Sequence, residues 1–404
     1  MAIKAGITLI SILLLCTTAA AAQGGKLLQT TNDFSAYTPV TKDGICKTLV
    51  ETQGYKCEEH TVTTNDGYIL SLQRIPTGRS GKKADKPPVL LQHGLFCNAV
   101  VWLFNSPKES LGFILADSGF DVWLANGRGS KYSTGHTTLT PNDMAYWDWS
   151  WYELASYDLP ASVEYVFNLT AQKIHYAGHS QGTLVAFVAL SQGKLLNMLR
   201  SAALLSPIAH LNMITSELTK VIAELFLAND VHWLGVREID PNAYDITKLV
   251  DGICFISNLN CGDVVTLFTG PNCCINSSRV DFYLDQPTAT RNFIHLSQMI
   301  RTGQIAKYDY VYEAQNMLHY GQGVPPTYDM TKIPKEFPLF ISYGGKDYLS
   351  DVQDVEVLLN DLSNHDADKL VVLYKDEYAH LDFIGAFDAK QVIYDPMLAF
   401  YNSN

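Results

Sequence analysis

The sequence predicts an α/β protein with a mostly parallel sheet, helices on both faces and a mostly helical insertion. Three observations lead to this prediction. Short apolar runs, typical of buried strands, alternate with segments of helical periodicity. This alternation stops between about residues 207 and 333 and resumes after Pro334. A serine flanked by glycines lies between one such strand and the helix that follows it.

The first predicted element is a hairpin, because two alternating segments, Glu58 to Thr63 and Tyr68 to Ile75, flank the turn sequence Asn65-Asp66-Gly67. Six apolar strands follow: Val89 to Gln92, Phe120 to Leu124, Ile174 to Ala177, Ala202 to Leu205, Leu339 to Ser342 and Leu370 to Tyr374. Helical patterns between them include Tyr152 to Phe167 and Gln181 to Gln192. We therefore expect a core made of residues 40–206 and 334–404, with residues 207–333 as a cap over the carboxyl edge of the sheet.

Composition limits the classes of partner. Apolar residues make up 47% of the chain and charged residues 17%, which is too apolar for a disordered protein. The net charge of −12 argues against nucleic acid or an anionic membrane as a partner, since both attract basic surfaces. Neutral lipid is not excluded by this charge.

Residues 1–22 have the composition of a secretory signal peptide. Lys4 supplies a positive charge, Ile7 to Leu15 is almost continuously apolar, and Ala19 to Ala22 offers small residues for cleavage. The alternative is an uncleaved anchor, because the apolar stretch approaches the length that spans a bilayer. We expect cleavage and no later membrane span, with an extracellular or a vacuole- or lysosome-like destination left open. Sequons for N-glycosylation begin at Asn168 and Asn276.

Export makes disulfides the default interpretation of the cysteines. Cys46 and Cys57 would close a short N-terminal loop. A second group comprises Cys254, Cys261, Cys273 and Cys274. Adjacent cysteines pair with difficulty, so we expect each of the last two to reach back to one of the first two, in an order that the sequence leaves open. Cys97 is left as a thiol, and the spacing does not favour the alternative of a zinc site.

The segment Gly178-His179-Ser180-Gln181-Gly182 joins a predicted strand to a predicted helix. At such a turn a serine takes strained backbone angles, and the flanking glycines let the turn close without Cβ clashes. The N-terminus of the helix directs amide groups toward developing negative charge. The pattern alone occurs by chance, but its position between strand and helix favours Ser180 as a nucleophile over an inert serine in a tight turn.

A serine hydroxyl needs a base, and the base needs an orienting carboxylate, which follow the serine in the order acid then histidine in this kind of fold. Asp347 follows the strand Leu339 to Ser342 after a sharp turn at two glycines. We expect Asp351 and Asp354 to face solvent on the next helix. Of the two later histidines, His365 lies in a polar run, so His380 is the predicted base.

Two backbone N–H groups are needed to hold a developing oxyanion. The sequence offers Gln181, which follows the serine, and Leu95, in the loop His93-Gly94-Leu95-Phe96. For His93 and His179 we expect packing or hydrogen-bonding roles. The aromatic run from Tyr146 to Tyr152 is interpreted as the packed start of a helix rather than a platform for a ligand.

These segments together resemble the acid-lipase family of eukaryotes, which includes gastric and lysosomal lipases and their plant relatives. The similarity extends from about Cys46 to the C-terminus. It rests on the motifs Asn65-Asp-Gly-Tyr68, Leu91-Gln-His-Gly-Leu95, Asn126-Gly-Arg-Gly129, Gly178-His-Ser-Gln-Gly-Thr183, Gly344-Gly-Lys-Asp347 and His380-Leu-Asp-Phe383. The segment Pro107 to Ile114 and the Cys273-Cys274 pair are similar to the plant branch.

The resemblance implies an α/β-hydrolase fold with a helical cap and hydrolysis of triacylglycerols or steryl esters through an acyl-enzyme, without a metal or other cofactor. The family's serine, aspartate and histidine fall on Ser180, Asp347 and His380. The implied partner is neutral lipid at a lipid–water interface. The sequence leaves open an acyltransferase or a small-ester esterase with the same triad, and a non-catalytic binding protein of the same fold.

Overall fold

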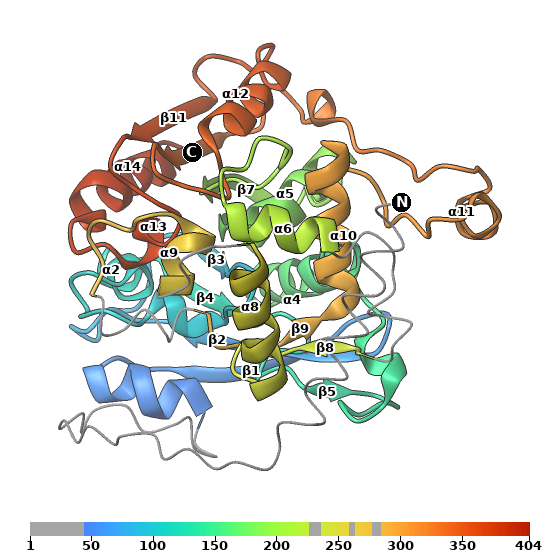
Figure 1. Cartoon of the computed structure of the whole chain (residues 1–404). Coiled ribbons are helices and arrows are strands. Elements are labelled where there is room, and N and C mark those ends of the chain that lie inside the picture. Colours follow the sequence, from blue (N-terminus) through green and yellow to red (C-terminus); the bar gives the residue numbers. More distant parts are fainter. Residues whose placement is uncertain (1–43, 226–235, 258–262, 277–283) are drawn as a thin grey trace.

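The fold is seen in a computed structural model that describes residues 44–225, 236–257, 263–276 and 284–404 (Figure 1). The predicted signal peptide, Cys261 and the last two residues of the sequon at Asn276 lie outside the described residues. Among the helices that the structure does describe, none is both long enough and apolar enough to cross a membrane.

A nine-stranded sheet forms the centre of the molecule, in the order β1-β2-β4-β3-β6-β7-β10-β11, with β5 paired to β2. The strands are β1 Glu58–Thr63, β2 Tyr68–Ile75, β3 Pro88–Gln92, β4 Asp121–Ala125, β5 Gly135–His136, β6 Ile174–His179, β7 Leu199–Leu205, β10 Leu339–Gly344 and β11 Leu370–Lys375. From β4 to β11 every pair is parallel, and the first two strands form the predicted antiparallel hairpin. The mostly parallel sheet is therefore confirmed.

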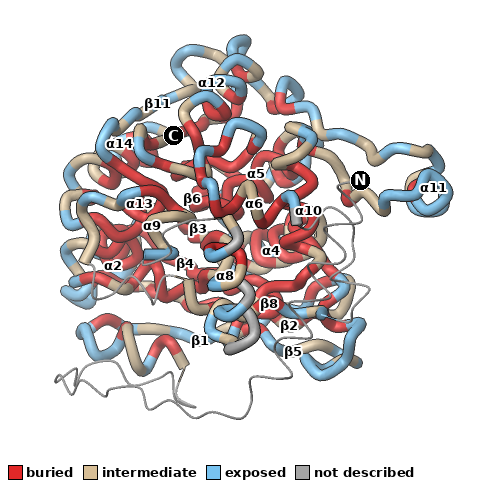
Figure 2. The backbone as a smooth tube through the Cα atoms, viewed as in Figure 1, coloured by how far each residue is buried: buried red, intermediate tan, exposed pale blue. Residues whose placement is uncertain are grey.

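Helices cover both faces of the sheet because its strands are apolar on both sides. In β3, Val89 and Leu91 pack into one buried cluster and Leu90 into the other. One face is covered by α4 Leu159–Thr170, α5 Gln181–Ser191 and α12 Val352–Asp361. The other is covered by α2 Leu111–Asp117, α13 Asp382–Gly385 and α14 Asp395–Ser403. Figure 2 shows the buried strands enclosed between these layers.

The interval 207–333 contains α6 Glu217–Leu225, α8 Tyr244–Ile256, α9 Val264–Thr269, α10 Thr290–Thr302 and α11 Glu313–Tyr320. It also holds a small antiparallel sheet of β8 Glu238–Ile239 and β9 Thr288–Ala289, which the sequence did not predict because two residues show no periodicity. Leu218, Ile253 and Phe293 belong to a separate buried cluster among these helices. This interval therefore has a buried cluster of its own.

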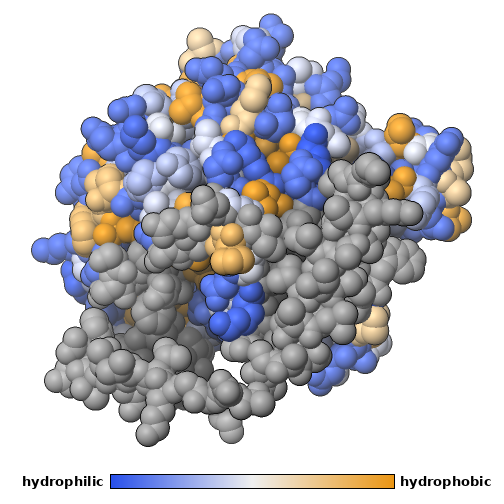
Figure 3. All heavy atoms as spheres, viewed as in Figure 1, coloured by the Kyte–Doolittle hydropathy of each residue, from blue (hydrophilic) through white to orange (hydrophobic). Residues whose placement is uncertain are grey.

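The helix α11 projects from the body, and hydrophobic residues gather on this projection in Figure 3. Elsewhere on the described part of that face, hydrophilic residues predominate. The exposed large apolar side chains of this projection are Val311, Tyr312, Met317, Leu318 and Val324. An apolar group on a projecting element is available for contact with another surface.

The disulfides correct one prediction. Cys46 and Cys57 are bonded as predicted, and Cys97 is a buried thiol. Cys273 and Cys274, however, are bonded to each other rather than to earlier cysteines. We had expected adjacent cysteines to pair with difficulty, but here both N–H groups point at the carboxylate of Asp382 and the chain bends so that the two side chains meet. This bond also occupies two of the sulfurs that a zinc site would use.

Cys254 forms a disulfide as well. Cys261, the remaining candidate for its partner, lies outside the described residues.

The sequon residue Asn168 is exposed near the end of α4, where Thr170 Oγ1 donates to the carbonyl of Val166. Glycosylation at Asn168 and Asn276 stays a prediction.

Candidate active site

Ser180 lies at the turn between β6 and α5 with backbone angles φ 55° and ψ −122°. Positive φ is rare for a residue with a Cβ and marks a strained turn that its surroundings must hold. The surroundings do so by close backbone packing. A Cβ at Gly178 would fall 2.7 Å from the carbonyl oxygen of Gly182, and one at Gly182 would fall 2.6 Å from that of Gln92. Both glycines are therefore required by the elbow that exposes Ser180.

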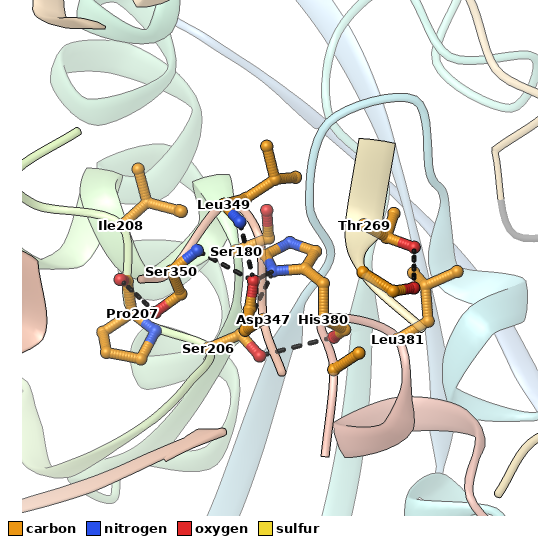
Figure 4. Close-up of polar contacts among 12 residues, drawn as sticks. Ser180, Ser206, Pro207, Ile208, Thr269, Asp347, Leu349, Ser350, His380 and Leu381 are labelled. Atoms are coloured by element: carbon orange, nitrogen blue, oxygen red, sulfur yellow. Dashed lines mark hydrogen bonds and ion pairs between the residues drawn. The ribbon is translucent and has the colours of Figure 1, made fainter. Parts of the chain in front are cut away.

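His380 and Asp347 form a direct pair at the carboxyl ends of β11 and β10. The Nδ1 atom of His380 lies 2.9 Å from Oδ2 and 3.0 Å from Oδ1 of Asp347 (Figure 4). A carboxylate accepts hydrogen bonds, so Nδ1 carries the proton and Nε2 is left as the basic atom. The two side chains are buried, with 3% of each residue exposed.

The carboxyl of Asp347 is held in its charged form. Burial alone would raise its pKa, but the charge of His380 and the hydrogen bond to it outweigh burial and keep the pKa below its usual range. The backbone N–H groups of Leu349 and Ser350 donate to Oδ1 at 2.9 and 2.8 Å and act in the same direction. The carboxylate is thus available to orient the imidazole.

The alternative acids and the alternative histidine lie away from the His380–Asp347 pair. Asp351 accepts a hydrogen bond from Gln353 N and caps α12, and Asp354 accepts one from Met213 N. The prediction that both face solvent is wrong, because these backbone partners draw them inside, where Asp351 is 8% and Asp354 2% exposed. His365, in the loop before β11, donates to the carbonyl of Phe337 and has no hydrogen bond with Asp347 or His380.

The loop after β3 runs directly against Ser180. A Cβ on Gly94 would lie 2.7 Å from Ser180 Cβ, so only glycine allows this approach. His93 ties the loop to the turn Asn126-Gly-Arg-Gly129: its Nδ1 lies 2.8 Å from the carbonyl of Gly94, and its Nε2 accepts from Gly127 N at 2.9 Å. Burial lowers the pKa of His93 to about 4, which fits a neutral ring in this bridge.

The turn that receives His93 is itself fixed by buried charges. The Arg128 guanidinium, fully buried, donates to Asp158 at 2.6 and 2.8 Å and to Asp66 at 2.6 and 3.0 Å. Bidentate pairing of this kind holds a guanidinium in one geometry. The loop that carries Leu95 is therefore supported through His93 and Gly127 by an ion-pair network.

These elements border one cavity. Ser180, His380, Leu95 and Gln181 all line it, and Asp347 lies behind His380. Its wall is mostly apolar: Leu95, Ile208, Leu211, Ile214, Phe268, Leu284, Phe293, Leu296, Ile300, Leu349 and Leu381. Such a wall suits a hydrocarbon chain close to a polar reacting group.

Two further residues fix the backbone of His380. The predicted hydrogen-bonding role of His179 is confirmed, whereas its partner and the contact of Ser206 were not predicted. The carbonyl of His380 accepts from His179 Nε2 at 2.8 Å and from Ser206 Oγ at 3.3 Å. Burial, with a contribution from the charge of His380, lowers the pKa of His179 to about 3, so its ring stays neutral and donates through Nε2. Only the position of His179 beside the serine hinted at this contact.

The aromatic run from Tyr146 to Tyr152 packs inside the molecule, as interpreted from the sequence. Tyr146, Trp147, Trp149 and Trp151 are buried. Ser150 forms a capping box with Glu153 at the start of α3 Trp151–Glu153. None of these residues lines the cavity at Ser180.

Two family models match the chain. A partial alpha/beta-hydrolase lipase region covers residues 46–106, and an alpha/beta hydrolase fold covers residues 87–234. Triacylglycerol lipase 2 of Arabidopsis thaliana is 46% identical over 89% of this chain and 87% of its own length. Lysosomal acid lipase/cholesteryl ester hydrolase of Homo sapiens is 36% identical over 96% of each chain.

A solved structure adds an independent comparison of the fold. A soluble variant of the monoglyceride lipase of Saccharomyces cerevisiae matches with a TM-score of 0.53 at 15% identity, over 85% of this chain and 94% of that one. Identity this low supports a shared fold only.

Proposed function

The chain belongs to the α/β-hydrolase lipase family that includes triacylglycerol lipases and lysosomal acid lipase, and on that premise we propose that it hydrolyses carboxylic esters of neutral lipids with Ser180, Asp347 and His380 as its triad. The observation that carries the proposal is the His380–Asp347 pair beside a strained serine in one apolar cavity. Triacylglycerols are the proposed substrates, with steryl esters as a further class. The proposed cap is residues 207–333, between core parts 40–206 and 334–404, with the signal peptide at 1–22.

The proposed reaction is acyl transfer in two steps. Ser180 Oγ attacks the ester carbonyl while His380 Nε2 takes its proton, and the amides of Leu95 and Gln181 hold the oxyanion. The imidazolium then protonates the leaving alcohol, which gives the acyl-enzyme. Water attacks this ester with His380 again as base, and the fatty acid leaves as Ser180 regains its proton. Asp347 keeps the tautomer correct and stabilises the imidazolium throughout.

The apolar wall of the cavity supports a substrate with a long acyl chain. Leu296 and Ile300 on α10 and Phe268 on α9 come from the interval 207–333, so the proposed cap would contribute much of the chain-binding surface. The exposed apolar side chains on the α11 projection are compatible with contact to a neutral lipid surface.

We propose that the protein enters the secretory pathway and acts outside the cell or in a lysosome- or vacuole-like compartment. N-terminal sequencing of the mature protein tests the cleavage after residue 22.

The decisive experiment compares initial rates of the wild type, Ser180→Ala and Ser191→Ala on emulsified long-chain triacylglycerol and on a short soluble ester, across pH 4 to 8. Ser191, at the end of α5, is the matched control because its hydroxyl only bonds the Val188 carbonyl. We expect hydrolysis of the emulsion that depends on Ser180 and is unaffected by Ser191→Ala. Cleavage of the soluble ester alone would reduce the protein to an esterase. If Ser180→Ala retained the full activity of the wild type, the proposed triad would be overturned.

A further inference from the structure

The loop that carries His380 has three successive backbone N–H groups, those of residues 379–381, and each donates a hydrogen bond. The N–H of Ala379 donates to Asp382 Oδ2 at 2.8 Å, that of His380 to the Thr269 carbonyl at 3.1 Å, and that of Leu381 to Asn272 Oδ1 at 2.9 Å. Thr269 and Asn272 belong to the insertion. The loop that carries His380 is therefore tied to the segment 269–274 and not only to the sheet.

Asp382 contacts both the loop of His380 and segment 269–274, and we call the contact between these two segments the junction. Its Oδ2 accepts from Ala379 N and from Cys273 N at 3.1 Å, and its Oδ1 accepts from Cys274 N at 3.1 Å. The residue is completely buried. Three N–H donors on one buried carboxylate are a charge-assisted arrangement that a neutral side chain cannot reproduce, since only a carboxylate accepts on both oxygens.

The segment 269–274 fits closely against the neighbouring loop as well. A Cβ on Gly270, whose φ is 93°, would lie 2.0 Å from the carbonyl oxygen of Lys346, the residue before Asp347. Figure 4 shows Thr269 and Leu381 facing each other beside His380. The disulfide between Cys273 and Cys274 joins the two residues whose N–H groups point at Asp382. Segment 269–274 thus contacts both the loop that carries Asp347 and the loop that carries His380.

We propose that Asp382 is a positioning residue, which fastens segment 269–274 of the insertion to the loop of His380 and so fixes the imidazole relative to Ser180 and Asp347. This inference rests on the proposed function. It assigns the insertion a second role, since part of it supports the base instead of only covering the cavity. Asp382 touches no reacting atom and acts through the backbone at residues 379–381.

The charge state of Asp382 sets the conditions of the test. Burial and, to a smaller extent, the neighbouring charge of Asp388 raise its pKa to about 6, against the effect of the three backbone N–H groups. The Tyr378 hydroxyl on the same loop donates to Asp388 and not to Asp382. Measurements at pH 7.5 therefore examine the ionised carboxylate.

The test compares Asp382→Asn with the wild type at pH 7.5. An amide offers one acceptor oxygen and turns an NH₂ group toward the N–H donors, so the junction should loosen. Because small misplacements of a catalytic group are costly, we expect kcat to fall about 100-fold while KM stays within about threefold. Hydrogen exchange should accelerate in peptides that cover residues 269–274 and 378–381.

Asp354→Asn is the matched control, since Asp354 is also a buried carboxylate with a backbone donor and has no contact with the loop of His380. We expect it to leave kcat and the exchange of both segments unchanged. An unchanged kcat in Asp382→Asn, or a rise in KM with kcat preserved, would overturn the proposal. If Asp382→Asn does not fold, Asn272→Ala replaces it. This change removes the bond to Leu381, together with the bonds from Asn272 Nδ2 to Thr269 Oγ1 and to the Gly270 carbonyl, and kcat should then fall several-fold at constant KM.

Failure of the proposed lipase function can be distinguished from failure of the positioning role proposed for Asp382. If the wild type shows no hydrolysis that depends on Ser180, the lipase proposal fails, and the exchange experiment alone judges the junction. Faster exchange in both segments of Asp382→Asn would then still support the fastening, and unchanged exchange would reject it.

Discussion

Both carboxylate oxygens of Asp347 lie within 3.0 Å of Nδ1 of His380, and His380 lines the same cavity as Ser180. The carboxylate is fixed from behind by the N–H groups of Leu349 and Ser350. A ring held this way cannot exchange its tautomer without breaking two hydrogen bonds. The orientation of the imidazole that we propose as the base is therefore set by the protein itself.

Asp347→Asn should leave the fold intact and remove most of the activity. The amide NH₂ group favours a proton on Nε2 instead of Nδ1, so the base faces Ser180 in the wrong tautomer. We expect kcat to fall about ten-thousand-fold, by analogy with the same change in serine proteases. Initial rates on the ester measure this, with Asp368→Asn in an exposed loop as the control. Retention of a tenth of the activity would contradict the assignment.

Gly94→Ala should damage catalysis more than stability. The added methyl group would meet Ser180 Cβ at 2.7 Å, so the loop must move away and carry the Leu95 amide with it. Loss of one donor to an oxyanion costs roughly a hundredfold or more in kcat. The readout is kcat together with labelling by a phosphonate serine probe. Gly193→Ala is the control, because its new Cβ meets no atom within 4 Å and the change adds only the backbone strain of a φ of 68°. Wild-type kcat in Gly94→Ala would show that this loop does not hold the oxyanion.

Asp158→Ala should destabilise the protein strongly. It leaves the buried Arg128 with only Asp66 as a charged partner, and removing one partner of a buried ion pair costs about 3–5 kcal/mol. Denaturant unfolding followed by fluorescence measures the change in the free energy of unfolding. Glu217→Ala removes an exposed ion pair with Lys220 and should change stability by less than about 1 kcal/mol. Equal effects of the two variants would contradict the role given to Arg128.

The elements that local pattern determines were predictable from the sequence. The hairpin at residues 58–75, the strand ending at His179 and the helix from Gln181 follow from periodicity, turn residues and glycine placement, and the structure has them within a few residues. The order of serine, aspartate and histidine along the chain narrowed the candidate site to residues that the structure brings to one cavity.

What the sequence did not reveal depends on contacts between distant segments. The bonds from His179 and Ser206 to the His380 carbonyl, and from Asp382 to Cys273 and Cys274, join positions more than a hundred residues apart or loops without periodicity. The prediction that Asp354 faces solvent fails for the same reason, since its partner Met213 lies 141 positions away. Patterns within one segment carry no information about such partners.

His295 makes the stability of the fold sensitive to acid. Its ring is buried on α10, stacked on Trp151 at a centroid distance of 4.1 Å, with Nε2 donating to the Ala306 carbonyl at 2.9 Å and Nδ1 3.0 Å from Ser150 Oγ. Burial, reinforced by the charge of Arg291, lowers the pKa of His295 to about 3. The folded protein therefore keeps this ring neutral at pH values where the unfolded chain protonates it.

Because the unfolded state binds the extra proton, the contribution of His295 to stability is complete above pH 6.5 and declines as the pH falls, by about 1.4 kcal/mol for each pH unit below about 6.5. His295→Gln keeps a donor toward Ala306 without the titration, so its free energy of unfolding should fall less steeply than that of the wild type between pH 6.5 and pH 4. Urea unfolding at several pH values measures both slopes. Trp151→Phe, which weakens the stacking but retains the histidine, should lower stability at every pH and keep the wild-type slope. Parallel curves for His295→Gln and the wild type would mean that the ring is already protonated in the folded protein.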